Sequence, residues 1–285
     1  MELKQIRYVV ENRVGVITLS RPDRMNAFTN RMMNEMLHVL DEAARDDSVR
    51  VLVVTGEGRA FCAGADLGAG GKTFDAEAAG EEVGLTGHRD GGGRVSLALF
   101  ASRKPVIAAI NGAAVGVGIT MTLPMDIRVV AEDAKIGFVF ARRGIVPEAC
   151  SSWFLPRIVG INKAVELCVT GRVFRAADEK ESGLFNYVVP ADQVLPKAME
   201  LAREIADNTS AVSVALARAL LWHGLGQPDP QHAHLVDSKA IFAMGRSPDA
   251  YEGVQSFLEK RQPNFTMSAW SDMPEFYPWW IEPKV

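Results

Sequence analysis

The chain has 285 residues, of which 48% are hydrophobic and 23% are charged, and its formal net charge is −4. A chain of this length and composition can bury a sizeable core. The acidic balance argues against nucleic acid as the main partner, because phosphate binding needs a basic surface. No run of about 18 apolar residues appears, so the sequence does not predict a membrane span.

The three cysteines, Cys62, Cys150 and Cys168, form no cluster with metal-ligand spacing. Their odd number favours reduced thiols in a cytoplasmic protein. The first five residues also lack the basic-then-apolar order of a signal peptide. We therefore expect a cytoplasmic location.

The first two-thirds of the sequence alternates predicted strands and helices, starting with a hairpin over residues 7–19. Thr29 is placed to cap a helix, because apolar residues recur at helical spacing from Met32 to Leu40 behind it. Three apolar runs, 51–54, 106–110 and 127–130, lack polar alternation, which indicates strands covered on both faces. This order predicts an α/β fold.

Beyond about residue 190 the pattern predicts successive helices at 195–207, 211–223, 230–244 and 248–260. A helical module is therefore expected to follow the α/β core. Residues 68–93 are rich in glycine and acidic side chains, which favours a mobile loop or lid. The tail after Arg261 carries many large aromatic residues, so it should pack on its own body or on a neighbouring subunit.

Two glycine-containing turns, 61–67 and 111–118, each follow a predicted buried strand. Small residues let the backbone approach a ligand closely, and a helix that opens there points free N–H groups outward. Two such turns side by side would aim two donors at one oxygen, as in an oxyanion hole. From spacing alone, a structural role for both turns is an equal alternative.

Nucleotide binding fits these segments less well. Gly112, Gly116 and Gly118 do not give the G-x-G-x-x-G spacing of a dinucleotide loop. The segment 71–73 imitates the end of a phosphate-binding loop, but Asp66 stands where that loop needs a glycine.

A series of motifs resembles the crotonase (enoyl-CoA hydratase/isomerase) superfamily, in order and at suitable spacings over residues 7 to 262. The matching segments are Arg21–Ala27, Phe61–Leu67, Asn111–Gly118, Asp126–Arg128, Leu167–Gly171, Ala176–Gly183 and Phe257–Arg261. The resemblance implies an α/β spiral of ββα units over residues 1–205. A C-terminal helical trimerisation module with an aromatic tail would span residues 206–285. It also implies a homotrimer, often paired into a hexamer.

The resemblance further implies an acyl-CoA thioester substrate and no separate cofactor, since coenzyme A enters as part of the substrate. The N–H groups of Ala65 and Val117 would form the oxyanion hole, with Val117 at a position where the family usually has glycine. The substrate-binding and CoA-binding residues would be Arg24, Ala63, Gly64, Asp66, Leu67, Gly116, Phe140, Phe257 and Lys260. Phe257 and Lys260 would lie near the CoA adenine and phosphate, with a neighbouring subunit as a possible source; a solvated lysine is the alternative for Lys260. Asp66 fits local turn hydrogen bonding better than a role as a base.

The site residues do not follow the hydratase pattern. The positions where the family's hydratases carry two glutamates hold Thr120 and Phe140. The segment 146–152 instead resembles that of Δ3,Δ2-enoyl-CoA isomerases, in which Glu148 matches the catalytic base. Burial beside Phe140 and Trp153 would raise the pKa of Glu148 if those rings line the pocket.

Several alternatives stay open at this point. Glu148 could instead occupy the first turn of a helix, where the dipole favours acids. The chain could also hydrate an enoyl-CoA, or bind acyl-CoA without turnover. His232 and His234 form an H-x-H pair without other ligands nearby in the sequence, so we expect surface residues and no metal site. Cys62 lies beside the first turn, but no histidine is placed to activate it.

Overall fold

The computed structural model describes residues 1–77, 80 and 84–280. Its larger sheet has six strands in the order β1-β2-β3-β5-β7-β10, and its smaller sheet has the order β4-β6-β8-β9. The larger sheet comprises β1 (Ile6–Glu11), β2 (Val14–Leu19), β3 (Val51–Gly56), β5 (Val106–Ile110), β7 (Ile127–Ala131) and β10 (Tyr187–Val189). The smaller sheet comprises β4 (Ala60–Cys62), β6 (Ala113–Val115), β8 (Lys135–Gly137) and β9 (Val173–Arg175).

The two sheets are built from a repeated unit, as the resemblance implied. Strands β3, β5 and β7 pair in parallel in the larger sheet, and each is followed by a strand of the smaller sheet and then by a helix. The helices are α3 (Gly91–Phe100), α4 (Val117–Thr120) and α5 (Ser151–Val159), and α6 (Ile161–Thr170) follows α5. This ββα repeat places the start of each helix beyond the smaller sheet, where the glycine-containing turns lie.

The N-terminal elements match their sequence predictions. Strands β1 and β2 form the predicted antiparallel hairpin. Helix α1 (Asn30–Arg45) begins after Thr29, whose side chain accepts a hydrogen bond from the Met32 N–H. The three apolar runs are strands β3, β5 and β7, and β3 and β5 are buried along their whole length.

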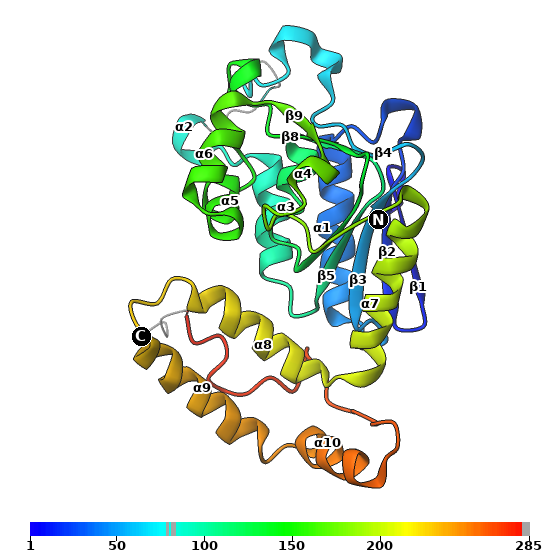
Figure 1. The fold of residues 1–285 in the computed structure, drawn as a ribbon, viewed down its shortest axis with the longest axis vertical. Coiled ribbons are helices and arrows are strands. Elements are labelled where there is room, and N and C mark those ends of the chain that lie inside the picture. Colours follow the sequence, from blue (N-terminus) through cyan, green and yellow to red (C-terminus); the bar gives the residue numbers. More distant parts are fainter. Residues whose placement is uncertain (78–79, 81–83, 281–285) are drawn as a thin grey trace.

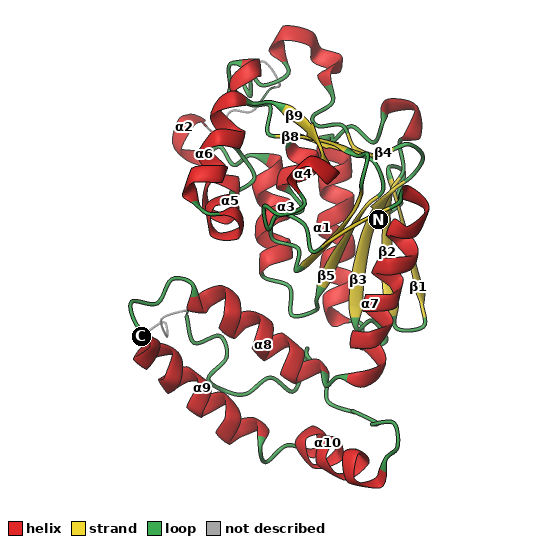
Figure 2. Cartoon of the chain, in the orientation of Figure 1, coloured by secondary structure: helices red, strands yellow, loops and turns green. Residues whose placement is uncertain are grey.

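The helices of the C-terminal module are α8 (Ala211–Gly224), α9 (Pro230–Met244) and α10 (Pro248–Glu259). Figure 2 shows them gathered in the lower part of the molecule, below the body that holds the strands. The expected division at residue 205 falls inside α7 (Val194–Asn208), which packs against β2, β3, β5 and β7. That division stays a prediction.

A buried ion pair ties α8 to the core. The Arg218 guanidinium lies 2.8 Å from the Asp126 carboxylate and also donates to the carbonyls of Leu99 and Phe100. Asp126 also accepts the Val106 N–H, at the start of β5. These contacts fix the first helix of the module against the strand that leads into the second glycine-containing turn.

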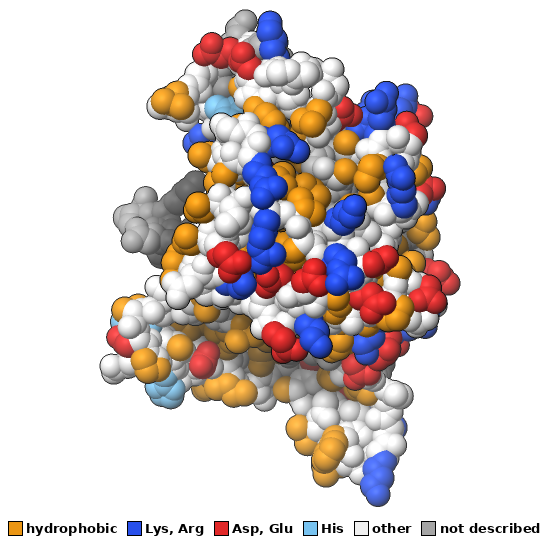
Figure 3. All heavy atoms as spheres, turned by 45° about the horizontal axis from the view of Figure 1, so that its top comes forward, with side chains coloured by type: hydrophobic (Ala, Val, Ile, Leu, Met, Phe, Trp, Pro, Cys, Tyr) orange, Lys and Arg blue, Asp and Glu red, His pale blue; other side chains and the backbone are white. Residues whose placement is uncertain are grey.

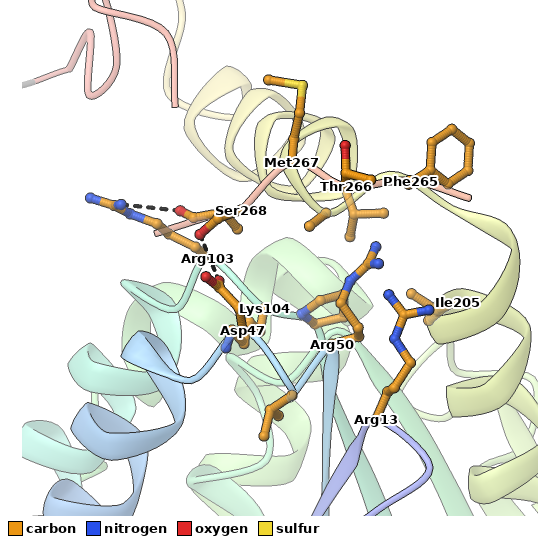
Figure 4. Close-up of a pocket in the computed structure, with 15 residues that line it drawn as sticks. Arg13, Asp47, Arg50, Arg103, Lys104, Ile205, Phe265, Thr266, Met267 and Ser268 are labelled. Carbon is orange, nitrogen blue, oxygen red and sulfur yellow. Dashed lines mark hydrogen bonds between the residues drawn. The ribbon is translucent and has the colours of Figure 1, made fainter. Parts of the chain in front are cut away.

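The aromatic tail packs on its own chain. Arg103 donates to the carbonyls of Ala269 and Trp270, and the Ser268 hydroxyl bonds to Asp47. Figure 4 shows this junction, where the tail lies over a cavity of about 100 Å³ into which Arg13 and Arg50 point. Further along, Trp280 stacks on His223 of α8 at a ring distance of 3.6 Å. Arg103 and Asp47 are therefore used in holding the tail.

The expectation of a loop or lid over residues 68–93 is wrong at the C-terminal end of that segment, where α3 begins. Residues Leu67–Lys72 form exposed 3-10 turns on the two sides of a kink at Gly70, and α2 (Gly84–Gly87) is a single turn. Gly91, Gly92 and Gly93 form the first turn of α3, because the Asp90 side chain caps it by accepting the Gly93 N–H at 2.6 Å. Residues 78–79 and 81–83 of the expected loop lie outside the described residues.

Within the described residues, no helix combines the length and the hydropathy needed to span a membrane.

Candidate active site

The two glycine-containing turns lie against each other at the ends of β4 and β6, which pair in parallel. A Cβ built on Gly116 would lie 3.9 Å from the Gly64 Cα, and one built on Gly118 would lie 2.0 Å from the Cys62 carbonyl oxygen. Gly64 and Gly116 also have positive φ angles of 107° and 54°. Glycine is therefore required for the close approach of the two turns.

The hydrogen bonds around these turns leave the two candidate donors free. A bridge between Phe28 and Ala65 uses the Gly64 carbonyl and the Asp66 N–H, so the Ala65 N–H points away from Phe28. Val117 is the first residue of α4, where the N–H has no partner inside the helix. Neither N–H has a partner within the described part of the chain. Two unpaired donors on touching turns are what an oxyanion hole requires.

Glu148 does not lie in a helix. Helix α5 begins at Ser151, and Ala149 and Cys150 both adopt left-handed backbone angles with φ of 56° and 57°. The alternative that Glu148 occupies the first turn of a helix and serves the helix dipole is therefore wrong. Left-handed backbone at a residue other than glycine costs about 1–3 kcal/mol, and such strain clusters at functional sites.

The bent turn directs the Glu148 carboxyl toward α3 and α4. The Thr120 hydroxyl donates to Glu148 Oε1 at 2.6 Å, and the same hydroxyl lies 3.3 Å from the Gly116 carbonyl oxygen. On the other side, a Cβ built on Gly92 would lie 2.1 Å from Glu148 Oε2 and 3.0 Å from Val117 Cγ2. Glu148 and the second oxyanion turn thus meet over the first turn of α3.

The surroundings of Glu148 favour its neutral form. Burial of the carboxyl raises the pKa of Glu148 to about 7, the Thr120 hydrogen bond acts in the opposite direction, and the nearby Asp90 carboxyl adds to the rise. A group with a pKa near 7 can both take up and return a proton at neutral pH.

The aromatic side chains near this segment belong to the core. Phe140 is 3% exposed, and Trp153 packs edge-to-face with Phe100 and Phe154. Trp222 of α8 joins the same cluster, with its ring 5.9 Å from that of Phe100. Helix α5, which follows Glu148, is thereby packed against α3 and α8.

Residues of the first turn have structural partners. The Asp66 carboxylate bonds to the Arg21 guanidinium at 2.8 Å and to the Gly68 N–H at 2.9 Å, and these bonds lower the pKa of Asp66. Such bonds hold the turn that carries Ala63, Gly64 and Ala65, and Leu67 beyond it is more than half exposed. Burial raises the pKa of the Cys62 thiol to about 12, so Cys62 is a poor nucleophile at neutral pH.

The remaining predicted residues are not brought to Glu148 by this chain. Arg24 is exposed and lies 3.9 Å from Asp23. Phe257 and Lys260 lie at the end of α10, in the lower part of Figure 1, while α4 and α5 lie in the upper body. His232 is exposed and lies 3.2 Å from Asp229, on α9.

Sequence reasoning missed two residues of the site, Asp90 and Gly92. The signal was present as the run Asp90-Gly91-Gly92-Gly93, which combines a helix-capping side chain with small residues. A glycine run is also typical of loops, and nothing local distinguishes the two cases.

Comparison with known proteins decides the family. The family model described as enoyl-CoA hydratase/isomerase matches residues 10–268. The chain belongs to this family. It is 48% identical over 257 residues to the enoyl-CoA hydratase ACTT3 of Alternaria alternata, covering 88% of this chain and 82% of that protein. It is 34% identical to the 1,2-epoxyphenylacetyl-CoA isomerase of Escherichia coli, covering 90% of this chain and 96% of that protein.

Solved structures of the family share the fold of this enzyme. A probable enoyl-CoA hydratase/isomerase from Mycobacterium abscessus is similar with a TM-score of 0.83 and 33% identity, covering 93% of this chain and 99% of the other. An enoyl-CoA hydratase from Bacillus anthracis is similar with a TM-score of 0.81 and 32% identity, covering 92% and 99%. The protein is therefore a crotonase-superfamily enzyme with the α/β fold that the motifs implied.

Proposed function

We propose that this enzyme isomerises an enoyl-CoA, moving the double bond from C3–C4 to C2–C3, with Glu148 as the acid/base. One observation carries the proposal. The carboxyl of Glu148 meets the Val117 turn over Gly92, and its pKa is raised to about 7. The proposed reaction needs no resident cofactor, because coenzyme A is part of the substrate.

The proposed reaction moves one proton and consumes none. The Glu148 carboxylate takes a proton from C2, the C2–H electrons extend the conjugation, and a dienolate forms with its negative charge on the thioester oxygen. The Ala65 and Val117 N–H groups stabilise that oxygen, where removal of one donor typically costs about 3–4 kcal/mol of barrier. Glu148 then returns the proton to C4, and the double bond is left between C2 and C3.

The side chains around Glu148 support proton transfer better than the addition of water. Hydratases of this superfamily use two glutamates, and the corresponding positions hold Thr120 and Phe140. The Phe140 side chain has no group that can donate or accept a proton, and the Thr120 hydroxyl already donates a hydrogen bond to Glu148. A site without a second group to hold water also protects the dienolate from side reactions.

Hydration is the second candidate, because relatives such as ACTT3 are named enoyl-CoA hydratases. In that case Glu148 would activate the water that adds to the double bond. The two reactions change the ultraviolet absorbance of the conjugated thioester in opposite directions. A 3-enoyl-CoA gains absorbance on isomerisation, whereas crotonyl-CoA loses it on hydration.

The test is Glu148→Gln, which keeps the volume of the side chain and removes its acid/base function. We expect turnover of 3-enoyl-CoA to fall by about 10²–10⁴-fold, the usual contribution of a general acid/base, while acyl-CoA affinity stays within a few-fold. Glu181→Gln is the matched control, since that carboxyl is exposed. Unchanged turnover in Glu148→Gln would refute the role of Glu148. Tight binding without any turnover in the unaltered enzyme would indicate a non-catalytic acyl-CoA-binding protein.

We also propose that the enzyme assembles as a homotrimer or homohexamer through the helical module. Exposed apolar side chains on α9 and α10 support this; they include Ile241, Phe242, Tyr251, Val254, Phe257 and Leu258. Figure 3 shows hydrophobic side chains on the projecting lower part of the molecule. A lone protomer would leave this surface in water. Sedimentation should give three or six times the chain mass of 31.0 kDa, and a monomer would refute the proposal.

A further inference from the structure

We propose that Asp90 positions Glu148. Its side chain holds the bent turn that follows Glu148 and places a second carboxyl next to the Glu148 carboxyl. This inference rests on the proposed role of Glu148 and extends it to a residue outside the usual hydratase pair. It explains how one carboxyl can serve as the acid/base in a site that lacks both of those glutamates.

Asp90 joins two elements that are far apart in the sequence. Its Oδ1 accepts the Gly93 N–H at 2.6 Å, which begins α3, and the Ala149 N–H at 3.1 Å. Ala149 is the residue directly after Glu148 and has left-handed backbone angles. Asp90 therefore pins the strained turn to the helix against which the Glu148 carboxyl lies.

The same carboxyl also interacts with Glu148 itself. A hydrogen bond with Asp90 and the proximity of its charge both favour protonated Glu148. Two N–H groups donate to Asp90 Oδ1 and hold this carboxyl beside Glu148. The charged neighbour then stabilises the form of Glu148 that carries the proton.

The glycine run makes room for this pair. A Cβ on Gly93 would lie 2.6 Å from Asp90 Oδ2, and a Cβ on Gly92 would lie 2.1 Å from Glu148 Oε2. The first turn of α3 thus has one glycine under each carboxyl. The space at Gly93 accommodates the capping carboxyl of Asp90 itself, whereas the space at Gly92 lies beside Glu148 and serves no purpose in a helix cap.

Among the described residues, the titratable groups that interact with Glu148 are Asp90, Cys62 and Cys150. Burial raises the pKa of both thiols, so they are neutral at neutral pH. Thr120 of α4 contributes a hydroxyl that carries no charge. Asp90 is therefore the charged group through which the protonation of Glu148 can be changed.

Asp90→Asn is the informative substitution. The asparagine oxygen can still accept the Gly93 and Ala149 N–H groups, so the helix cap and the turn are retained. The negative charge is lost, and the pKa of Glu148 should fall. The isomerase base is active when ionised, so kcat/KM rises with pH through the pKa of Glu148. In Asp90→Asn, the pH at which kcat/KM reaches half of its maximum should be lower by about one unit. Below both midpoints the variant should then be roughly tenfold faster than the unaltered enzyme.

The experiment compares pH profiles of kcat/KM for the unaltered enzyme, Asp90→Asn and Asp229→Asn. Asp229 caps α9 in the same way and is exposed, so Asp229→Asn should leave the profile unchanged. Asp90→Ala removes the acceptor as well, and should lower kcat more than it raises KM. An unchanged midpoint in Asp90→Asn would show that Asp90 is only a helix cap and would overturn the inference.

A second measurement separates this inference from the proposed function. The carboxyl carbon of Glu148 in ¹³C-glutamate-labelled protein, assigned with Glu148→Gln, reports its titration without turnover. If Glu148→Gln remains active, the proposed function fails, yet a lower Glu148 midpoint in Asp90→Asn would still support the pairing. If Glu148→Gln is inactive and the midpoint does not move, the pairing fails and the proposed function stands.

Discussion

Substitution of Gly92 by alanine should reduce activity while changing the free energy of unfolding little. The added Cβ would lie 2.1 Å from Glu148 Oε2, whereas ordinary contact begins at 3.4 Å. The carboxyl must therefore retreat by about 1.3 Å, the difference between these two distances. The Glu148 carboxyl is the far end of a flexible side chain and can move away. The added Cβ would also lie 3.0 Å from Val117 Cγ2 and 3.1 Å from the Ala149 Cβ, so these two neighbours must give by a few tenths of an ångström.

The magnitude follows from the displacement. A misplacement of about 1 Å in a catalytic group can cost about 10²-fold in rate, which is about 2.7 kcal/mol of barrier. The free energy of unfolding should change by less than about 1 kcal/mol, because the preference of helices for alanine over glycine opposes the crowding at Val117 and Ala149. A less active enzyme that unfolds at nearly the same urea concentration as the unaltered one is the expected combination.

The assay follows the rise in conjugated thioester absorbance from a 3-enoyl-CoA, alongside urea denaturation at a fixed protein concentration. Gly91→Ala is the matched control in the same helical turn. Its Cβ would meet the flexible Met33 sulfur at 3.0 Å and not the carboxyl, so its kcat should stay within a few-fold. Turnover by Gly92→Ala within about threefold of the unaltered enzyme would refute the placement of Glu148 against α3.

Two further predictions concern the oxyanion hole and the anchoring of α8. Val117→Pro removes one proposed donor at the first position of α4, where proline is tolerated, and should lower kcat by about 10²–10³-fold; a smaller loss than tenfold would argue against this donor. Arg218→Ala leaves the Asp126 carboxylate without its partner in a site where Arg218 is 9% exposed, and should lower the free energy of unfolding by about 3–5 kcal/mol. The exposed pair of Arg175 with Asp178 is the control, because Arg175→Ala should lower the free energy of unfolding by less than about 1 kcal/mol. Equal losses of unfolding free energy in the two variants, measured by urea denaturation, would contradict the argument.

Much of the fold follows from patterns that are local in the sequence. The strands β3 and β5 are buried along their whole length, and continuous apolar strands of this kind are stable only when both faces of the sheet are covered. Helix α9 has the bounds that its apolar pattern predicted, and Asp229 and Pro230 mark its start. The two glycine-containing turns could be found because the first comes soon after β3 and the second directly after β5.

The candidate site could be predicted only in part. Ala65, Val117 and Glu148 belong to motifs whose order in the chain resembles a known family, so their positions in those motifs marked them, even though Val117 stands where the family usually has glycine. The conformation of the turn at Ala149 and Cys150 was not predictable, because left-handed backbone at such residues has no local sequence signal. For this reason the sequence left open a helix whose first turn holds Glu148, whereas α5 begins at Ser151.

The sequence by itself determined the α/β core, the C-terminal helices and the enoyl-CoA hydratase/isomerase family, and it singled out Glu148 as the carboxyl proposed for proton transfer. The tertiary structure decided what surrounds that carboxyl. Asp90 and Ala149 are 59 positions apart, and their hydrogen bond exists only because α3 and the turn before α5 pack together. For the same reason, the glycines at 91–93 looked like a loop in the sequence but leave space for side chains in the fold. Contacts of this kind depend on which surfaces meet, and no local pattern encodes that.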